Sequence, residues 1–541
     1  MSAHLKSAIR NFALLFAGCV LFHIAGIWSL PLIDRDEPRF AEASREMIER
    51  GDYIVPYFNN QLRLDKPPLT YWAQTVSYRV FGESDFAARF PSAIAAALTA
   101  LVIFVWGMRL GGEKLGWWAA IIFTLSLQTF VHAKAAVADM WLVLFVTLAH
   151  WVGYELIHLP TLNSDRSRAG VQLRKLSRAG SATPNTEEIN QTSNIKHQTS
   201  LCWWFTFYLA LALGFLAKGP VAWVPLLTVG TTIIFAGDAQ LARRFKFVYG
   251  ILLTLAVVAL WGIPAVIQTR GEFFTVGIGR HVIRRSFATM EGHGANSPAT
   301  YLLLLPFYFV TVFVSFFPWS IKLPWLARRL RRERKAGVIR LRQGYGGQDA
   351  AGYSEKLIDK YLVTGVAIIF IIFTLIKTKL PHYTLPAFPL LALLLARHWH
   401  EAAMANRRSL PKTIAIVTAC VWIAIALAIP PMVARLFPAY QLFQESRASL
   451  QPNMQFASVE FEEPSLVWYF RSSVKGFLTP LNRRRAPEFM SASGPRFVVL
   501  PTPVAGTLFA NRPTNWHTFS TSGFNIAKGK RVDLTLVLKS E

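Results

Sequence analysis

The stretch Asp34-Arg35-Asp36-Glu37-Pro38-Arg39-Phe40-Ala41-Glu42 lies directly behind the first long apolar segment of this chain. A second polar stretch, Leu64-Asp65-Lys66-Pro67-Pro68-Leu69-Thr70-Tyr71-Trp72, follows in the same loop. Polar residues gathered at the mouth of a membrane span mark a functional site more often than a scaffold. The two stretches together predict an active site at the membrane surface.

The composition is that of a polytopic α-helical membrane protein. Of 541 residues, 53% are hydrophobic and 16% are charged, which is too apolar for a soluble chain of this length. The net charge of +26 is concentrated in short loops, so it indicates topology and contact with anionic lipids rather than nucleic-acid binding. Cys19, Cys202 and Cys420 lie far apart in apolar segments, so the sequence implies no disulfide framework.

Apolar windows of about twenty residues predict about eleven membrane spans. They lie at residues 12–33, 90–110, 116–132, 138–158, 201–216, 219–236, 247–269, 299–320, 358–376, 384–397 and 413–434. The first window follows Lys6 and Arg10, and we interpret it as an uncleaved signal anchor. Because no internal repeat is evident, the sequence argues against an inverted-repeat transporter.

Positive residues fall in alternate loops, which orients the chain in the membrane. The basic loops are 160–200, 237–246, 321–357 and 398–412, and they are assigned to the cytoplasm. The loop 34–89 and every other polar motif then fall on the opposite side. A membrane domain over 1–436 and a C-terminal domain over 437–541 are expected. The apolar runs Phe497–Leu500 and Leu534–Leu538 predict strands, so the C-terminal domain is expected to be a small α/β unit.

Asp36 and Glu37 are the first candidate site residues. Pro38 suits the first turn of a helix, and the apolar spacing that follows predicts a helix that ends at Gly51. The positive end of that helix would keep Asp36 ionised. An ionised carboxylate at the membrane surface can accept a proton or orient a hydroxyl group. For Glu37, a simple capping role is equally open.

The second polar stretch supplies a candidate phosphate ligand. Pro67 and Pro68 force an extended backbone, which fixes the direction of Lys66 beside Asp65. A lone lysine near a membrane interface is often only an anchor whose ammonium reaches the headgroups. The stiff backbone and the neighbouring carboxylate favour phosphate contact here.

Asp139 stands at the head of a later span, between two apolar runs. A carboxylate at the centre of a bilayer costs about 2.5 to 3.5 kcal/mol, so Asp139 is expected to face protein or a water-filled cavity. A capping role is the alternative, and function is slightly favoured.

Several cations are expected to converge on the same face. Lys218 lies in the turn Ala217-Lys218-Gly219-Pro220 between two apolar segments, and further cations lie in 280–285 and 377–383. Cations above apolar walls suit a phosphate carried on a lipid tail. The histidines show no metal-ligand spacing, and nucleotide-binding and hydrolase motifs are absent, so neither a metal nor a cofactor is expected. The chemistry that fits is transfer of a group from a lipid phosphate.

Five motifs in this order resemble the bacterial 4-amino-4-deoxy-L-arabinose lipid A transferase (ArnT) family, which is related to the protein O-mannosyltransferases. They are Asp36-Glu37-Pro38-Arg39-Phe40-Ala41-Glu42, Gly51-Asp52-Tyr53-Ile54-Val55-Pro56, Asp65-Lys66-Pro67-Pro68, Ala217-Lys218-Gly219-Pro220 and Lys379-Leu380-Pro381-His382-Tyr383. The resemblance covers about residues 10 to 400. It implies a GT-C glycosyltransferase with about 11–13 transmembrane helices and surface helices in its first periplasmic loop.

The resemblance also implies an activity and roles for single residues. The reaction would be an inverting transfer of a sugar from undecaprenyl phosphate to lipid A, at the periplasmic face of the bacterial inner membrane. Asp36 and Asp139 match catalytic aspartates, and Lys66 and Arg284 match contacts to the carrier phosphate. The full set of expected substrate contacts is Glu37, Asp65, Lys66, Tyr71, Lys218, Arg284, Lys379, His382 and Tyr383.

One departure leaves the sugar open. The arabinose transferases often carry Glu-Lys-Pro where this chain has Asp65-Lys66-Pro67. The acceptor is open as well, since a protein or another envelope glycan could replace lipid A. A flippase that moves a sugar lipid without chemistry is disfavoured, because the charges gather on one face instead of spreading through the bilayer midplane.

Overall fold

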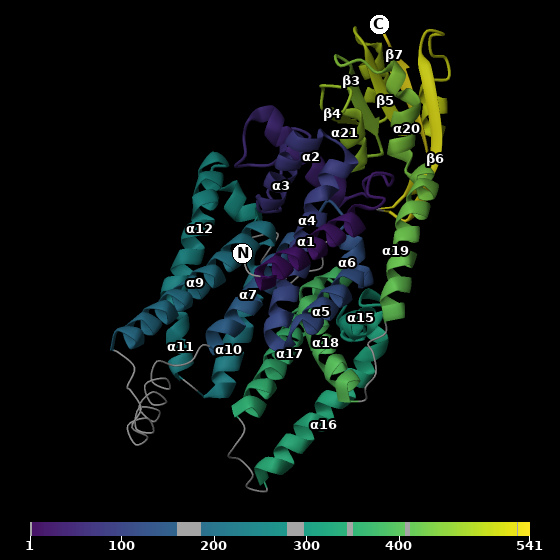
Figure 1. Ribbon diagram of the computed structural model, residues 1–541. Helices are drawn as coiled ribbons and strands as arrows, with labels where there is room; N and C mark the ends of the chain where they lie inside the picture. The colour runs from purple at the N-terminus through teal and green to yellow at the C-terminus, as the bar shows by residue number, and fades with distance from the viewer. Residues whose placement is uncertain are drawn as a thin grey trace, which may run out of the picture.

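The computed structural model describes residues 3–158, 186–237, 239–277, 297–342, 350–405, 412–526 and 528–541. Figure 1 shows a bundle of long helices with a small sheet, formed by the C-terminal part of the chain, at one end. The helix α19 leads from the bundle to this sheet. The described part of the chain therefore has the predicted architecture of a helical membrane protein with a small C-terminal α/β unit.

The bundle is built from helices of very different lengths. Its first half contains α1 (Ala3–Ile24), α4 (Asp85–Gly111), α5 (Glu113–Leu125), α6 (Leu127–His132), α7 (Asp139–His158), α9 (Thr186–Lys218), η1 (Pro220–Trp223), α10 (Val224–Ala236), α11 (Ala239–Phe245) and α12 (Phe247–Gln268). Its second half contains α14 (Pro298–Leu303), α15 (Phe307–Ser315), η3 (Trp319–Lys322), α16 (Leu323–Arg342), α17 (Ala350–Leu375), η4 (Pro381–Ala387), α18 (Phe388–Ala405) and α19 (Lys412–Val433).

Six helices in the described residues are long and apolar enough to cross a membrane, or seven if one bent pair is a single span. The six are Asp85–Gly111, Asp139–His158, Ser200–Lys218, Ala239–Gln268, Leu357–Leu375 and Lys412–Leu436. They coincide with six of the eleven predicted segments. The other five correspond to shorter or interrupted helices, so the total number of spans stays a prediction.

The interrupted segments have local causes. The predicted segment 116–132 is divided into α5 and α6 because Ser126 has an extended backbone, with ψ 134°. The predicted segment 299–320 is divided by Pro306 and Pro318, which precede α15 and η3. Proline has no amide hydrogen to continue a helix, so it favours a break at these positions.

The first helix ends nine residues before the apolar window 12–33 does. It ends at Ile24, and Gly26 follows with a φ of 76°. A Cβ atom at Gly26 would lie within 1.9 Å of the carbonyl oxygen of Ala426 in α19. Only glycine allows this close approach and this backbone conformation together. The apolar window therefore contains the end of α1 and, after it, a turn that packs against α19.

Small residues let the central helices approach closely. A Cβ atom on Gly107 of α4 would lie 2.8 Å from the Cα atom of Gly116 in α5. Ala95, Ala96 and Ala100 of α4 are fully buried in the same core. Packing of small residues is the usual way in which membrane helices associate, because lipid supplies no hydrophobic driving force between them.

The first loop contains two helices that lie outside the long spans. These are α2 (Asp36–Arg50) and α3 (Leu69–Phe81), and a short hairpin of β1 (Tyr57–Phe58) and β2 (Gln61–Leu62) lies between them. The predicted helix from Pro38 to Gly51 is confirmed. Its start lies two residues earlier, at Asp36, and Gly51 ends it in the left-handed conformation with a φ of 67°.

On α3, the apolar side chains Val76, Val80 and Phe81 are exposed. An amphipathic helix with such a face suits the membrane interface. This observation agrees with the expected surface helices of the first loop.

The C-terminal part forms a five-stranded mixed sheet in the order β4-β3-β5-β7-β6. Its strands are β3 (Gln455–Val459), β4 (Leu478–Leu481), β5 (Arg496–Pro501), β6 (His517–Asn525) and β7 (Lys530–Lys539), and its helices are α20 (Pro438–Ser446), α21 (Pro464–Phe470), α22 (Arg485–Ser491) and α23 (Thr502–Leu508). β3 is parallel to β4 and β5, whereas β7 is antiparallel to β5 and β6. Both predicted strands are confirmed, as β5 and β7. The domain boundary between residues 436 and 437 stays a prediction.

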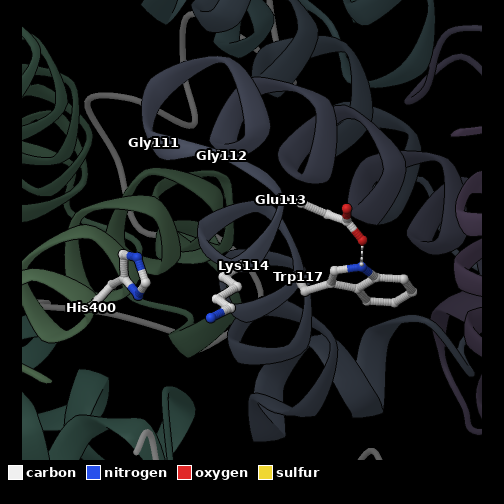
Figure 2. Close-up of a pocket in the computed structure, with 6 residues that line it drawn as sticks. All are labelled: Gly111, Gly112, Glu113, Lys114, Trp117 and His400. Carbon is white, nitrogen blue, oxygen red and sulfur yellow. Dashed lines mark hydrogen bonds between the residues drawn. The ribbon is translucent and has the colours of Figure 1, made fainter. Parts of the chain in front are cut away.

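A cavity of about 420 Å³ lies where α4 ends and α5 begins (Figure 2). It is lined by Gly111, Gly112, Glu113, Lys114, Trp117 and His400. The Glu113 carboxylate accepts hydrogen bonds from the Trp117 indole, at 3.3 Å, and from Asn11, at 2.8 Å. This cavity lies at the far end of α4 from Asp85, about 39 Å along the helix axis. It is therefore separate from the polar motifs of the first loop.

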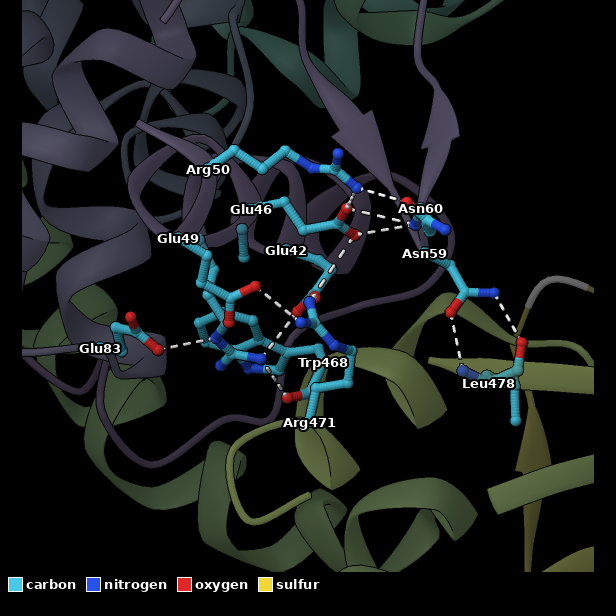
Figure 3. A network of polar contacts seen from close by, with 12 residues as sticks. Glu42, Glu46, Glu49, Arg50, Asn59, Asn60, Glu83, Trp468, Arg471 and Leu478 are labelled. Carbon is cyan, nitrogen blue, oxygen red and sulfur yellow. Dashed lines mark hydrogen bonds and ion pairs between the residues drawn. The ribbon is translucent and has the colours of Figure 1, made fainter. Parts of the chain in front are cut away.

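A network of charged side chains joins α2 to the C-terminal unit (Figure 3). Arg471 pairs with Glu42 and, at 2.6 Å, with Glu49. Arg45 contacts Glu42 at 2.7 Å and donates to the carbonyl oxygen of Trp468 at 3.0 Å. Burial raises the pKa of Glu42 to about 7, although Arg45 and Arg471 act in the opposite direction. The two parts of the chain are thus joined by desolvated ion pairs.

The same interface contains neutral hydrogen bonds. The Asn59 amide donates to the carbonyl oxygen of Leu478 at 2.8 Å and accepts from its N–H at 2.8 Å (Figure 3). The Tyr469 hydroxyl accepts from the N–H of Leu32 at 2.8 Å. Because these contacts flank α2 on both sides, the C-terminal unit holds the helix that begins at Asp36.

Replacing Arg471 with methionine is expected to destabilise the protein strongly, because the buried Glu42 would lose one of its two cationic partners and keep only Arg45. Loss of one partner from a buried pair costs about 3 to 5 kcal/mol. Thermal unfolding of the purified protein measures the effect as a lower Tm. The matched control is Arg483→Met, whose ion pair with Glu460 is exposed, so its Tm should not change. Equal Tm values for the two variants would contradict the structural role of Arg471.

Candidate active site

Asp36 is the first residue of α2, and its side chain is exposed. The structure gives its carboxylate no hydrogen bond or ion pair within the described residues. The helix is not capped by a side chain, so its positive end faces this carboxylate directly. Asp36 therefore stands at the surface with free acceptor oxygens, as a residue that meets substrate would.

Arg63 is a cation of this site that the sequence analysis did not identify. Its Nε atom donates to the Tyr71 hydroxyl at 2.8 Å and lies 3.2 Å from Asp65 Oδ1. Burial alone would lower the pKa of Arg63, but Asp65, Tyr71 and Asp36 together raise it above its ordinary value. Its Nη2 atom is buried and has no hydrogen-bond partner in the described part of the chain. Arg63 thus holds a permanent positive charge beside Asp36.

Lys66 and Tyr71 belong to the same group. The Lys66 ammonium lies 4.0 Å from Asp65 Oδ2, and its side chain is partly exposed. Tyr71 is fully buried, and its ring lies 5.1 Å from the ring of Phe40. Tyr71 therefore holds Arg63 in place, whereas Lys66 is accessible from outside.

A second polar group forms around Asp139, the first residue of α7. The Lys218 ammonium donates to Asp139 Oδ1 at 2.5 Å, and His382 Nε2 lies 3.9 Å from the same oxygen. Lys218 is the last residue of α9, before the turn into η1, which confirms the predicted position of this cation. The Lys218 ammonium also lies 5.9 Å from the centre of the Tyr383 ring. Three segments far apart in the sequence thus meet at one carboxylate.

The group around Asp139 could hold a metal ion by its ligand types. His132, Asp139 and His382 each offer one ligand atom, and these atoms lie within 4.8 Å of one another. Lys218 already places a positive charge on the Asp139 carboxylate. A metal ion there would have to compete with this ammonium group.

The two polar groups are adjacent. Ala138, next to Asp139, packs with Phe40 of α2 and with Tyr71 of α3 in one small apolar cluster. Asp36 and Asp139, the first residues of α2 and α7, therefore lie on either side of this cluster. The group around Asp36 and the group around Asp139 thus belong to one region.

Glu37 lies beside Asp36 but has a different environment. Its carboxylate is buried and pairs with Arg89 of α4 at 2.7 Å. It also accepts from the N–H of Ile33 at 2.7 Å and from the N–H of Ala136 at 2.6 Å. Because both oxygens are occupied by protein donors, the contacts favour a positioning role for Glu37. Neither N–H belongs to α2, and α2 has no side-chain cap, so the capping alternative for Glu37 is wrong.

Lys379 was expected to contact substrate, but its ammonium group binds backbone carbonyl groups of the protein instead. Its ammonium donates to three carbonyl oxygens at the end of α17, those of Phe373, Thr374 and Ile376. The distances are 3.0, 2.5 and 2.6 Å. These bonds use all three of its protons, so Lys379 closes the C-terminal end of a helix. Arg284, the other expected phosphate ligand, lies outside the described residues.

Sequence reasoning missed Arg63, Arg89 and His132 as members of this region. Arg63 lies directly before the second polar stretch, two residues before Asp65, and this closeness in sequence was the available signal. Arg89 is separated from Glu37 by 52 positions, and no local pattern links the two. His132 stands at the end of a short apolar helix, where its proximity to Asp139 depends on the turn between them.

A family model and several curated relatives that this chain matches are all named as glycosyltransferases. Residues 65–162 match the family model described as dolichyl-phosphate-mannose-protein mannosyltransferase. The chain is 30% identical over 396 residues to the undecaprenyl phosphate-alpha-4-amino-4-deoxy-L-arabinose arabinosyl transferase 2 of Sodalis glossinidius, covering 72% of this chain and 60% of that protein. A transferase of the same name from Serratia proteamaculans is 26% identical, covering 81% and 68%. The chain spans 60–63% of the length of the first three curated relatives that it matches.

A comparison with solved structures supports the fold over the whole chain. The crystal structure of ArnT from Cupriavidus metallidurans bound to undecaprenyl phosphate superposes with a TM-score of 0.67 at 16% identity. The match covers 97% of this chain and 97% of that one. At this identity the similarity establishes the architecture. The resemblance drawn from the five motifs is thus confirmed: the chain is an ArnT-like membrane protein with the GT-C fold.

Proposed function

We propose that this chain is an inverting glycosyltransferase that moves a sugar from an undecaprenyl-phosphate carrier to lipid A. The observation that carries the proposal is the exposed carboxylate of Asp36, which makes no hydrogen bond or ion pair within the described residues and lies near the Arg63 guanidinium. Lys66 shares the neighbouring Asp65 carboxylate with Arg63. The names of the relatives support the same donor and suggest 4-amino-4-deoxy-L-arabinose as the sugar. The proposal requires no cofactor.

The cations act on the donor. In the transfer, the bond between the anomeric carbon and the carrier phosphate breaks, and the phosphate leaves as an anion. Lys66 is accessible and stands beside Asp65, so it is positioned to bind that phosphate. Arg63 adds a fixed positive charge behind it. Arg284 is proposed as a further phosphate contact from the resemblance alone.

Asp36 acts on the acceptor. A hydroxyl acceptor attacks the anomeric carbon from the face opposite the phosphate, and this attack inverts the configuration at that carbon. Asp36 takes the proton of the attacking hydroxyl group. A phosphate group of lipid A is already ionised at neutral pH. With such an acceptor, Asp36 orients the attacking group instead of deprotonating it.

Asp139 is proposed as the second functional aspartate. Its carboxylate holds the Lys218 ammonium at 2.5 Å and faces His382. Through these contacts it fixes the direction of two groups that line the site together with Tyr383. Its role is therefore to position the Lys218 ammonium, which stabilises the departing phosphate.

We propose that this site faces the periplasm from the bacterial inner membrane. The four basic loops fall on the opposite side by parity, which supports the orientation. Residues 1–436 then form the catalytic membrane domain, and residues 437–541 form a periplasmic domain that contacts α2. The ion pairs between Arg471 and α2 support this division of roles.

The acceptor is tested by mass spectrometry of lipid A from cells with and without this chain. We expect a mass increment on lipid A that disappears on deletion, and its size identifies the sugar. Unchanged lipid A would contradict lipid A as the acceptor. Envelope proteins from the same cells would then be examined for a lost sugar.

Replacing Lys66 with methionine is expected to weaken donor use and to affect turnover less. A hydrogen bond to a charged group contributes about 1.5 to 3 kcal/mol, so the KM for the donor should rise by about 10- to 100-fold. Steady-state assays with purified protein and a polyprenyl-phosphate sugar measure the change. Lys475→Met is the control, since Lys475 is exposed in the C-terminal part. An unchanged KM would remove Lys66 from the phosphate site.

A further inference from the structure

A second cluster of ionisable side chains lies between three helices, far from the candidate active site. Glu333 belongs to α16, Asp359 to α17, and His398 and Glu401 to α18. From Asp359 to Leu375, where α17 leads toward His382, the helix rises about 24 Å. In Figure 1, α16 lies at the lower end of the molecule, away from the C-terminal sheet. We propose that Glu333, Asp359 and His398 form a binding site for a divalent transition metal ion.

His398 is buried but has no hydrogen-bond partner for its ring. Its exposed fraction is 1%, and neither ring nitrogen makes a hydrogen bond in the described part of the chain. Nε2 lies 3.3 Å from Asp359 Oδ2, and Nδ1 lies 3.7 Å from Glu333 Oε1. These distances exceed the 2.7–3.2 Å range of ordinary N–H···O hydrogen bonds. A buried imidazole aimed at carboxylates without bonding to them needs a further partner.

The spacing suits a metal ion. Each of Glu333, Asp359 and His398 offers one ligand atom, and these three atoms lie within 4.8 Å of one another. Metal–ligand bonds of about 2.0 to 2.2 Å in tetrahedral geometry place neighbouring ligand atoms about 3.3 to 3.6 Å apart. Small side-chain rotations would bring the three atoms to this separation.

The ring nitrogen of His398 that does not bind the ion would lie beside a carboxylate, which is a usual partner of metal-binding histidines. Nε2 faces Asp359, whereas Nδ1 faces Glu333 and, at 3.8 Å, Glu401 Oε2. Whichever nitrogen binds the ion, the other can therefore donate to a carboxylate. This arrangement fixes the tautomer and the orientation of metal-binding histidines.

The charges of the cluster favour a cation. Arg329 lies 2.8 Å from Glu333 and 2.9 Å from Glu401, and Arg397 lies 3.1 Å from Asp359 and 3.4 Å from Glu401. Two guanidinium groups face three carboxylates, which leaves one net negative charge when His398 is neutral. Imidazole with carboxylates selects zinc-like ions over magnesium, which prefers an all-oxygen site.

The site is open on one side. The side chains of Glu333 and Glu401 are 46% and 39% exposed. An ion could enter there, and a water molecule could complete its coordination. Because the ligands come from three helices, a bound ion would join α16, α17 and α18 and stabilise this part of the bundle.

Zinc binding to the full-length purified protein tests this proposal. After treatment with a chelator, the protein is titrated with zinc and its bound metal is counted. His398→Gln should bind one zinc ion fewer than the wild type, whereas His400→Gln, two residues along the same helix, should bind the wild-type number. Zinc should also raise the Tm of the wild type and of His400→Gln more than that of His398→Gln. Magnesium should raise none of them.

Equal zinc content and equal Tm shifts in His398→Gln and His400→Gln would overturn the proposal. The cluster would then be an ion-pair network without a metal ion. Where His398→Gln does not fold, Asp359→Asn provides the same comparison, because it removes a different ligand. The readouts are metal content and Tm, so they are independent of the transferase activity.

Discussion

The buried ion pair between Glu37 and Arg89 is the constraint on which the site depends. Glu37 also receives the N–H groups of Ile33 and Ala136, and Arg89 donates to the carbonyl oxygens of residues 27, 30 and 31. One pair thus joins four parts of the chain: the segment between α1 and α2, the start of α2, the start of α4 and the turn before α7. Burying two charges adds little net stability, so the pair mainly specifies geometry. Its geometry places Asp36 and Asp139 together.

The division of labour between neighbouring carboxylates follows from this arrangement. Glu37 is occupied by protein donors, whereas Asp36 next to it is exposed and makes no hydrogen bond or ion pair in the described part of the chain. On the other side of α2, Glu42 and Arg471 attach the helix to the C-terminal unit. The helix is therefore held from the membrane bundle and from the sheet. Such support at both sides keeps a reactive side chain in place at a lipid surface.

Local patterns predicted the elements that depend on nearby residues. The helix from Pro38 to Gly51, the position of Asp139 at a helix start and the cation at Lys218 each follow from capping, turn or apolar-run signals. The strands β5 and β7 follow from short apolar runs. Interactions between distant segments could not be predicted this way. The burial of Arg63 against Tyr71 and the closure of α17 by Lys379 depend on how the chain packs, and the backbone carbonyls that bind Lys379 have no sequence signature.

The central claim is that Asp36 is the carboxylate that acts on the acceptor. The most direct test is the rate of sugar transfer from a polyprenyl-phosphate donor by purified Asp36→Asn protein, compared with the wild type. Asparagine keeps the size of the side chain but cannot take a proton. We predict that kcat falls by about 10²- to 10⁴-fold while the Tm is unchanged. Turnover close to the wild-type rate would contradict the account.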